Sequence, residues 1–454
     1  MRNRQEQWSG SIGFILSTMG SAIGLGSIWK FPYEVGTNGG GAFVFCYLLG
    51  LVLIVFPLML VEFSIGRRGR SDATGSIALV AGESGSSRCW QILGAVGVIT
   101  SFLILSFYSV IGGWALSYAV DTVRNGLPGD SASAVQERFD SLLAAPWSMA
   151  GYHAVFMTLT ALIVARGIAG GIESACKVLM PILIILVIAL ALYSMSKGDV
   201  YAGLRFLFGF DRELISARVA LEALGLGFFS IGVGLAVMIT YASYAGPDID
   251  LRQVAIATII GDTAVSCLAG LAVFPIVFGE KLDPASGPGL MFVTLPLAFA
   301  RLPFGTPAAV TFFALLAVAG FASAISLLEM PVAFLQRRIA CSRRFATVFS
   351  ALACWALGLF SVLSFNVWAD WFPLASIPGL AKASMFDLLD QLTSNMLLPA
   401  GSFALAVFGG WVIPTSLFAD ELRLGATAVA VIRALLRYVV PCGIAAASLA
   451  PLRF

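Results

Sequence analysis

Charged side chains are scarce in this 454-residue chain. They make up 11% of it, against about 25% in an ordinary soluble protein. Hydrophobic residues make up 59%, and the mean hydropathy is +0.93, so a soluble globular enzyme is excluded. Basic and acidic residues nearly balance, at 27 and 25. The sequence therefore has no basic excess for nucleic acid, and we expect no nucleic-acid partner.

Histidine and paired cysteines are also lacking. His153 is the only histidine, and no cysteine/histidine or paired-carboxylate arrangement accompanies it, which argues against an enzyme. The seven cysteines show no metal-ligand spacing, and those in apolar runs fit a role as small packing residues. These absences favour an integral membrane protein.

Long apolar runs, by contrast, fill the chain. About 20 apolar residues cross the ~30 Å hydrocarbon layer of a bilayer. Apolar windows bounded by charge, proline and glycine predict an all-α membrane protein with eleven helices. Their expected ranges are 11–35, 41–66, 90–121, 148–165, 172–195, 215–243, 254–279, 308–335, 345–366, 387–413 and 426–450.

The distribution of basic residues predicts the orientation. Lysine and arginine are more frequent in the segments that lie inside if the N-terminus is cytoplasmic. The clearest case is the connection between the eighth and ninth helices, with Arg337, Arg338, Arg343 and Arg344. The positive-inside rule then predicts a multi-pass protein of the cell inner (plasma) membrane, with a cytoplasmic N-terminus and an external C-terminus.

Two glycine- and serine-rich clusters interrupt the first and sixth predicted helices. They cover residues 20–27 and 225–234, at mid-membrane depth, where unwound backbone must be buried or line a cavity. Their positions correspond if residues 11–195 form a five-helix repeat, residues 215–413 form an inverted second repeat, and residues 426–450 add one helix. Broken helices direct N–H groups at an anion and carbonyls at a cation, which favours binding of an anionic group together with Na⁺.

Specific motifs surround these clusters. They are Trp8, GSAIGLG at 20–26, WKFPY at 29–33, NGGGAF at 38–43 and TYASY at 240–244. Together they closely resemble the neurotransmitter:sodium symporter family, in its prokaryotic eleven-helix branch of amino acid transporters. The resemblance implies two inverted five-helix repeats, with an amino acid and sodium bound where helices one and six unwind.

The resemblance also implies a substrate pocket. In the family, backbone N–H groups at Gly24 and Gly26 and the hydroxyl of Tyr108 bind the substrate carboxylate. Members that take decarboxylated amines carry an acid at position 24, so glycine implies an intact amino acid. The pocket has no charged side chain, which favours a neutral, largely hydrophobic substrate. The full set carried over is Ala22, Gly24, Leu25, Gly26, Ile104, Tyr108, Phe229, Ser230, Gly232, Leu235, Ser323 and Leu327.

Sodium ligands follow from the same resemblance. The first site takes oxygens from Ala22, Ser27, Ser230 and Asp262, and such hard oxygens suit Na⁺. The second site maps to the carbonyls of Gly20, Ile23 and Ala319 and the hydroxyl of Ser323. Ala322 stands where relatives supply a side-chain oxygen to this second site. We therefore expect one or two sodium ions.

Chloride is not expected to be a partner. The positions that hold chloride in dependent relatives are Tyr47, Leu226, Ser230, Asp262 and Ser266. One donor is lost at Leu226, and a fixed negative charge has appeared at Asp262. We interpret Asp262 as a replacement for chloride that compensates the charge of the sodium from within the protein.

The resemblance also implies gate residues on the outer and inner sides. Lys30 and Asp390 match the external gate pair, although relatives usually carry arginine and Lys30 alone fits a snorkelling anchor. On the inner side, the family joins an N-terminal arginine to an acid at the end of helix eight. Arg4 is near the arginine position, but Arg337 stands where the acid is expected, so Tyr244 is left as the inner gate residue. The sequence thus predicts sodium-coupled amino acid uptake by alternating access; a substrate sensor or a channel on the same scaffold is the alternative.

Overall fold

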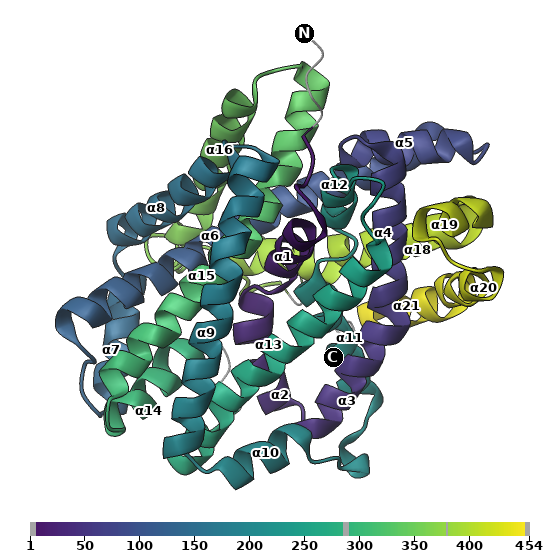
Figure 1. Cartoon of the computed structure of the whole chain (residues 1–454). Coiled ribbons are helices and arrows are strands. Elements are labelled where there is room, and N and C mark those ends of the chain that lie inside the picture. Colours follow the sequence, from purple (N-terminus) through teal and green to yellow (C-terminus); the bar gives the residue numbers. More distant parts are fainter. Residues whose placement is uncertain (1–5, 285–289, 378–379, 450–454) are drawn as a thin grey trace.

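The computed structural model describes residues 6–284, 290–377 and 380–449, and these ranges form helices and loops without strands (Figure 1). Nine of the described helices are long and apolar enough to cross a membrane, and the bent pair Ser11–Ala22 and Gly26–Thr37 makes a tenth. The prediction of an all-α membrane protein is confirmed.

The unbroken crossings begin and end within a few residues of their predicted ranges. They are α3 (Gly41–Gly50), η2 (Leu51–Val55) and α4 (Phe56–Gly69) as one crossing; α6 (Gln91–Asn125); α8 (Pro146–Val164); η4 (Ile168–Glu173) with α9 (Ser174–Lys197); α13 (Leu251–Gly279); α15 (Gly305–Ile339); α16 (Arg343–Ser364); α17 (Met385–Asp390), η7 (Gln391–Leu397), α18 (Leu398–Val407) and η8 (Phe408–Val412) as one crossing; and α20 (Ala426–Ala434), η9 (Leu435–Val439) and α21 (Val440–Leu449) as the last. Shorter helices in the connections are α5 (Ala73–Glu83), α7 (Ala132–Leu143), α10 (Val200–Phe208), η6 (Leu290–Thr294), α14 (Leu295–Arg301) and α19 (Thr415–Leu422). Residue 450, the last of the predicted extra helix, lies outside the described residues.

The first crossing is broken where the glycine-rich cluster predicted. Helix α1 (Ser11–Ala22) ends as Ile23 takes an extended conformation with φ −79° and ψ 90°. The chain resumes in η1 (Gly26–Lys30) and α2 (Phe31–Thr37), bent by 53° from α1. The N–H of Leu25 is thereby released from the helical hydrogen-bond ladder and donates to the Tyr108 hydroxyl instead, whereas Ile23 N–H still donates to the Met19 carbonyl.

The sixth crossing is broken over a longer stretch. Helix α11 (Ala217–Ile231) and α12 (Val237–Ser243) are separated by residues 232–236. Gly232 and Gly234 have φ of 72° and 88°, which glycine adopts without the steric cost of a Cβ. At Gly234 a Cβ would also overlap the hydroxyl of Ser402 on α18. Helices α11 and α12 are not among the nine helices and the bent pair, so the described residues give up to ten crossings by length and composition, and the eleventh stays a prediction.

Both breaks lie inside the helix bundle. Helix α1 runs through its middle and packs against α9, α13 and α15 (Figure 1). Helices α8 and α16 lie to one side of it, and α18 to α21 lie to the other (Figure 1). Unwound backbone at this place faces protein and cavities instead of lipid, as a membrane protein requires.

Candidate functional site

A narrow cavity of about 40 Å³ lies between the two breaks. Except for Leu25, every residue predicted to bind substrate lines it: Ala22, Gly24, Gly26, Ile104, Tyr108, Phe229, Ser230, Gly232, Leu235, Ser323 and Leu327. A space of this size holds only a few water molecules. A bulky ligand therefore requires that side chains around the cavity move.

Tyr108 on α6 marks the polar side of this cavity. Its hydroxyl oxygen accepts a hydrogen bond from the backbone N–H of Leu25, with an N–O distance of 3.1 Å. A phenol that accepts one bond can still donate its proton to an anion. Gly24 lies next to it: a Cβ there would be 2.8 Å from the Tyr108 oxygen and would overlap the Ser323 hydroxyl. Only glycine fits this close approach.

Four further residues line the cavity that the sequence reasoning missed: Ser21, Val237, Ser326 and Leu398. Ser326 follows Ser323 by about one turn of α15, so helical spacing could have indicated it. Leu398 starts α18. Nothing in its local sequence carries a signal, because its place depends on how a distant helix packs.

The predicted first sodium ligands meet beside the cavity. Asp262 on α13 is fully buried, and its carboxylate accepts hydrogen bonds from the hydroxyls of Ser27 at 2.5 Å and Ser230 at 3.0 Å. The Ser27 hydroxyl lies 3.5 Å from the Ala22 carbonyl oxygen. Carbonyl, hydroxyl and carboxylate oxygens are the hard ligands that suit Na⁺.

The charge of Asp262 calls for a cation. Among the described ion pairs none includes this carboxylate, and a buried charge without compensation is costly. A sodium ion held by these oxygens would neutralise it. The donor set, with a buried carboxylate that joins no described ion pair, therefore fits Na⁺.

Two of the three hydroxyls expected at a chloride position are engaged by the same carboxylate. Tyr47 on α3 donates to Asp262 at 2.8 Å, and Ser230 lies within 3.2 Å of both carboxylate oxygens. Leu226 on α11 is buried and apolar. Tyr47 and Ser230 are thus directed at the Asp262 carboxylate, whereas the buried hydroxyl of Ser266 is not bonded to it.

The region of the second sodium site lies where α1 approaches α15. The Ser323 hydroxyl lies 3.4 Å from the Gly20 carbonyl oxygen and 3.2 Å from that of Ser21. Ala322 is buried and offers a methyl group. Of the predicted ligands, Gly20 and Ser323 meet here, and position 322 offers no side-chain oxygen.

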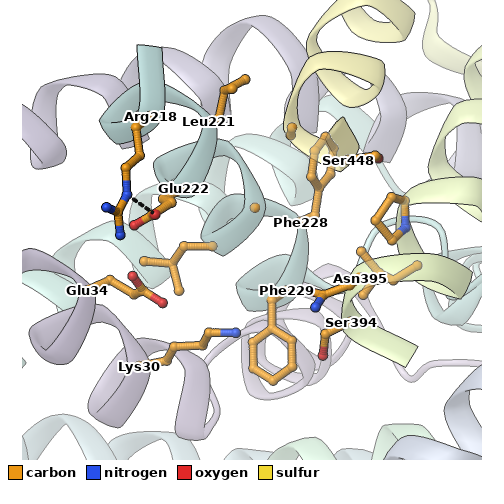
Figure 2. A pocket seen from close by; sticks show the side chains of 15 residues that line it. Lys30, Glu34, Arg218, Leu221, Glu222, Phe228, Phe229, Ser394, Asn395 and Ser448 are labelled. Carbon is orange, nitrogen blue, oxygen red and sulfur yellow. Dashed lines mark hydrogen bonds and ion pairs between the residues drawn. The ribbon is translucent and has the colours of Figure 1, made fainter. Parts of the chain in front are cut away.

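The predicted outer gate residues point to different partners. The Lys30 ammonium lies 4.4 Å from the centre of the Phe229 ring, whereas Asp390 accepts a hydrogen bond from Ser394 at 2.8 Å. No ion pair in the described part of the chain joins Lys30 to Asp390. Figure 2 shows Lys30 directed toward Phe229, in a cavity of about 450 Å³ that is lined by charged residues such as Glu34 and by apolar residues such as Leu221. Phe229 also lines the substrate cavity, so the ring that Lys30 contacts lies between the two cavities.

Tyr244 lies in a polar cluster at the opposite end of the bundle. Its hydroxyl donates to Glu329 at 2.8 Å, and Arg343 contacts the same carboxylate at 2.5 Å. Arg343 also lies 3.3 Å from Glu6. Arg337, which stands at the family's acid position, is exposed and joins no described ion pair. Arg4 lies outside the described residues.

The N-terminal segment is attached to this end of the bundle by further contacts. The indole N–H of Trp8 donates to the Tyr241 carbonyl at 2.8 Å, and the Glu6 carboxylate accepts from the Ile168 N–H at 2.9 Å. Ser9 N–H donates to the Glu173 carboxylate at 2.8 Å. The segment before α1 is therefore held against η4 and α12.

Glu62 on α4 supports the second break. It is fully buried, and its carboxylate accepts a hydrogen bond from the N–H of Gly234 at 2.7 Å. This bond satisfies a donor that the unwound chain has released.

Two broken helices that meet inside a membrane bundle, beside a buried carboxylate and a cavity, define a secondary transporter. The model of the sodium:neurotransmitter symporter family matches residues 5–141 and 132–449, and the chain belongs to this family. It is therefore a sodium-dependent membrane transporter and not an enzyme.

Individual relatives match over nearly the whole chain. The uncharacterised sodium-dependent transporter YhdH of Bacillus subtilis is 38% identical over 422 residues, covering 93% of this chain and 91% of that protein. The sodium-dependent dopamine transporter of Bos taurus is 26% identical, over 92% of this chain and 64% of that one. The crystal structure of MhsT in complex with L-phenylalanine has a TM-score of 0.89 at 39% identity, and the match covers 98% of this chain and 99% of that one.

Proposed function

We propose that the protein takes up a neutral, largely hydrophobic amino acid together with Na⁺, by alternating access and without chloride. The observation that carries this proposal is the cavity at the two helix breaks. It combines a backbone N–H and phenol pair at Leu25 and Tyr108 with apolar walls formed by Ile104, Phe229 and Leu327.

An amino acid fits the two sides of this cavity. A carboxylate can take the proton of Tyr108 and the N–H groups freed at the first break. The walls hold no charged residue, so a charged substrate side chain would be left without a partner. MhsT, which is 39% identical, has been crystallised with L-phenylalanine, and this supports a hydrophobic side chain.

Independence of chloride follows from the carboxylate of Asp262. It already supplies one negative charge next to the position proposed for Na⁺, and Tyr47 and Ser230 donate their hydroxyls to it. A bound chloride would lie close to this carboxylate and be repelled by it. We infer that the protein itself balances the charge of the ion.

The orientation and internal symmetry belong to the same proposal. We place the N-terminus in the cytoplasm and the C-terminus outside, in the cell inner membrane, from the excess of basic residues in the inner segments. Residues 11–195 and 215–413 then form two inverted repeats, with 426–450 as an added helix. The breaks in α1 and α11–α12, five crossings apart, support this division.

Two contact regions are proposed as gates. Lys30 over Phe229 closes the cavity outward, with Asp390 available on α17. Tyr244 and its partners Glu329 and Arg343 close the path inward. Alternating access requires that each region opens while the other stays closed.

The purified protein in proteoliposomes provides the test. Liposomes preloaded with unlabelled amino acid should accumulate the labelled amino acid when Na⁺ is present, and much less when K⁺ replaces it. A thermal-shift screen of the twenty amino acids identifies the substrate beforehand, because stabilisation follows RT ln(1 + [L]/Kd). Binding without exchange would instead indicate a sensor, and a flux that does not saturate would indicate a channel.

A further inference from the structure

The contact between α1 and α15 lacks an oxygen that a second sodium site would need. The four predicted ligands are three carbonyls, from Gly20, Ile23 and Ala319, and the hydroxyl of Ser323. Relatives supply one more side-chain oxygen to this site from position 322, which is a buried alanine here. A methyl group cannot ligate a hard cation.

The side chains that face Gly20 supply no oxygen ligand. A Cβ built on Gly20 would meet the Cys176 sulfur at 3.3 Å, the Met180 methyl at 3.4 Å and the Ala322 methyl at 3.6 Å. Thiol, thioether and methyl groups suit neither Na⁺ nor a water molecule that would stand in for a ligand, because such a water needs polar partners.

Hydroxyl groups connect the two helices directly at this place. The Ser323 hydroxyl lies within hydrogen-bond distance of the Gly20 and Ser21 carbonyls. The Ser21 hydroxyl donates to Ser326 at 2.8 Å, and the Ser326 hydroxyl donates to the Ser323 carbonyl at 2.8 Å. A chain of hydrogen bonds thus joins α1 to α15 without an ion.

We propose that this protein couples one Na⁺, bound at Asp262, to each substrate, and that the hydroxyls of Ser21, Ser323 and Ser326 replace a second ion as the connection between α1 and α15. The proposal rests on the proposed function, because it concerns the ion count of that transport cycle. A zwitterionic substrate with one Na⁺ then carries one net positive charge per cycle.

The ion count is tested by measuring labelled Na⁺ and labelled amino acid in the same proteoliposomes. We expect a flux ratio of 1 and a sodium dependence with a Hill coefficient of 1. A ratio of 2 in the wild type would overturn the inference while leaving the proposed function intact. Failure of the proposed function itself is distinguishable, because amino acid uptake would then show no stimulation by Na⁺.

Ala322→Thr tests the cause. Threonine adds the missing hydroxyl at a position that already faces α1, so the Hill coefficient should rise above 1 and the flux ratio should move toward 2. If the flux ratio stays at 1 in Ala322→Thr, the absence of a second sodium ion is not caused by the alanine at position 322, and this part of the inference is overturned.

The hydroxyl chain has a readout that does not depend on transport. In Ser326→Ala, hydrogen exchange of the amides of α1, measured in Na⁺ without substrate, should be at least several-fold faster than in the wild type. Ser364→Ala is the matched control, since Ser364 is also buried and donates to a carbonyl one turn earlier at 2.8 Å, but on α16. Equal exchange of α1 in the two variants would overturn the role of the hydroxyls as a connection.

Discussion

Replacing Asp262 by asparagine removes the charge that we place next to the sodium ion and keeps the shape of the side chain. The carboxylate lies 2.5 Å from the Ser27 hydroxyl and 3.0 Å from that of Ser230. A cation that shares these ligands lies within about 4 Å of the charge, so the substitution acts on a direct electrostatic contact.

The magnitude follows from Coulomb's law. Two unit charges about 4 Å apart attract by about 4 kcal/mol at an effective dielectric constant of about 20. A factor of ten in affinity corresponds to about 1.4 kcal/mol, so the loss is at most about a thousandfold. The amide oxygen remains as a ligand, and we expect Asp262→Asn to weaken the apparent sodium affinity by about a hundredfold to a thousandfold.

The assay compares sodium-dependent uptake in chloride and in gluconate. The wild type should transport equally in both, whereas Asp262→Asn should recover part of its sodium affinity in chloride, since an external anion can then balance the ion. Glu280→Gln is the control, because it removes an acid just beyond the outer end of the same helix. Loss of most wild-type uptake in gluconate, or an unchanged sodium affinity in Asp262→Asn, would refute the reasoning.

Four further substitutions test the cavity and its outer cover. Tyr108→Phe removes the phenol that contacts Leu25 N–H, and equilibrium binding of the amino acid should weaken by about ten- to a hundredfold, as for a hydrogen bond to a charged group. Gly24→Asp places a side chain against Ser323 and Tyr108, so binding should be lost while the thermal unfolding temperature in Na⁺ shows that the variant folds. Lys30→Met removes a cation–π contact worth about 0.5–2 kcal/mol, so bound substrate should dissociate outward about two- to thirtyfold faster. Asp390→Asn should change this dissociation rate less. A larger effect of Asp390→Asn than of Lys30→Met would contradict the contact described.

The sequence predicted the helices because each crossing is long, apolar and bounded by charge or proline. It also located both breaks, since glycine and serine are conspicuous in apolar helices and unwound backbone needs protein around it. The cavity residues between Ala22 and Tyr108 could be predicted because their motifs are formed by residues close together in the sequence. Their roles in binding remain predictions that the substitutions above test.

Contacts between distant segments could not be predicted in this way. The direction of the Lys30 side chain depends on where Phe229 lies after packing, and the contribution of Leu398 depends on the placement of α18. The inner cluster is the clearest case. Aligning family positions drew attention to Arg337, whereas the structure uses Arg343, six residues later, because only the start of α16 faces Glu329.

This inner cluster yields a prediction about the path to the cytoplasm. Arg343 is 11% exposed and contacts Glu329 at 2.5 Å, Glu6 at 3.3 Å and the Val164 carbonyl at 2.8 Å. Arg343→Gln leaves the buried carboxylate of Glu329 without its cation, and breaking a buried pair in this way typically costs about 3–5 kcal/mol. The arginine joins α8, α15, α16 and the N-terminal segment, so its loss should release the start of α1.

Cys176 is a native reporter of that release. Its sulfur is buried and faces Gly20 of α1, so it should react with a water-soluble maleimide only after α1 moves away from α9. We expect Arg343→Gln to raise labelling of Cys176, resolved from the other cysteines by peptide mass spectrometry. Arg337→Gln is the matched control, because this exposed arginine joins no described ion pair, and it should leave the labelling unchanged. If both variants label Cys176 equally, below their unfolding temperatures, then Arg343 does not hold the inner side closed.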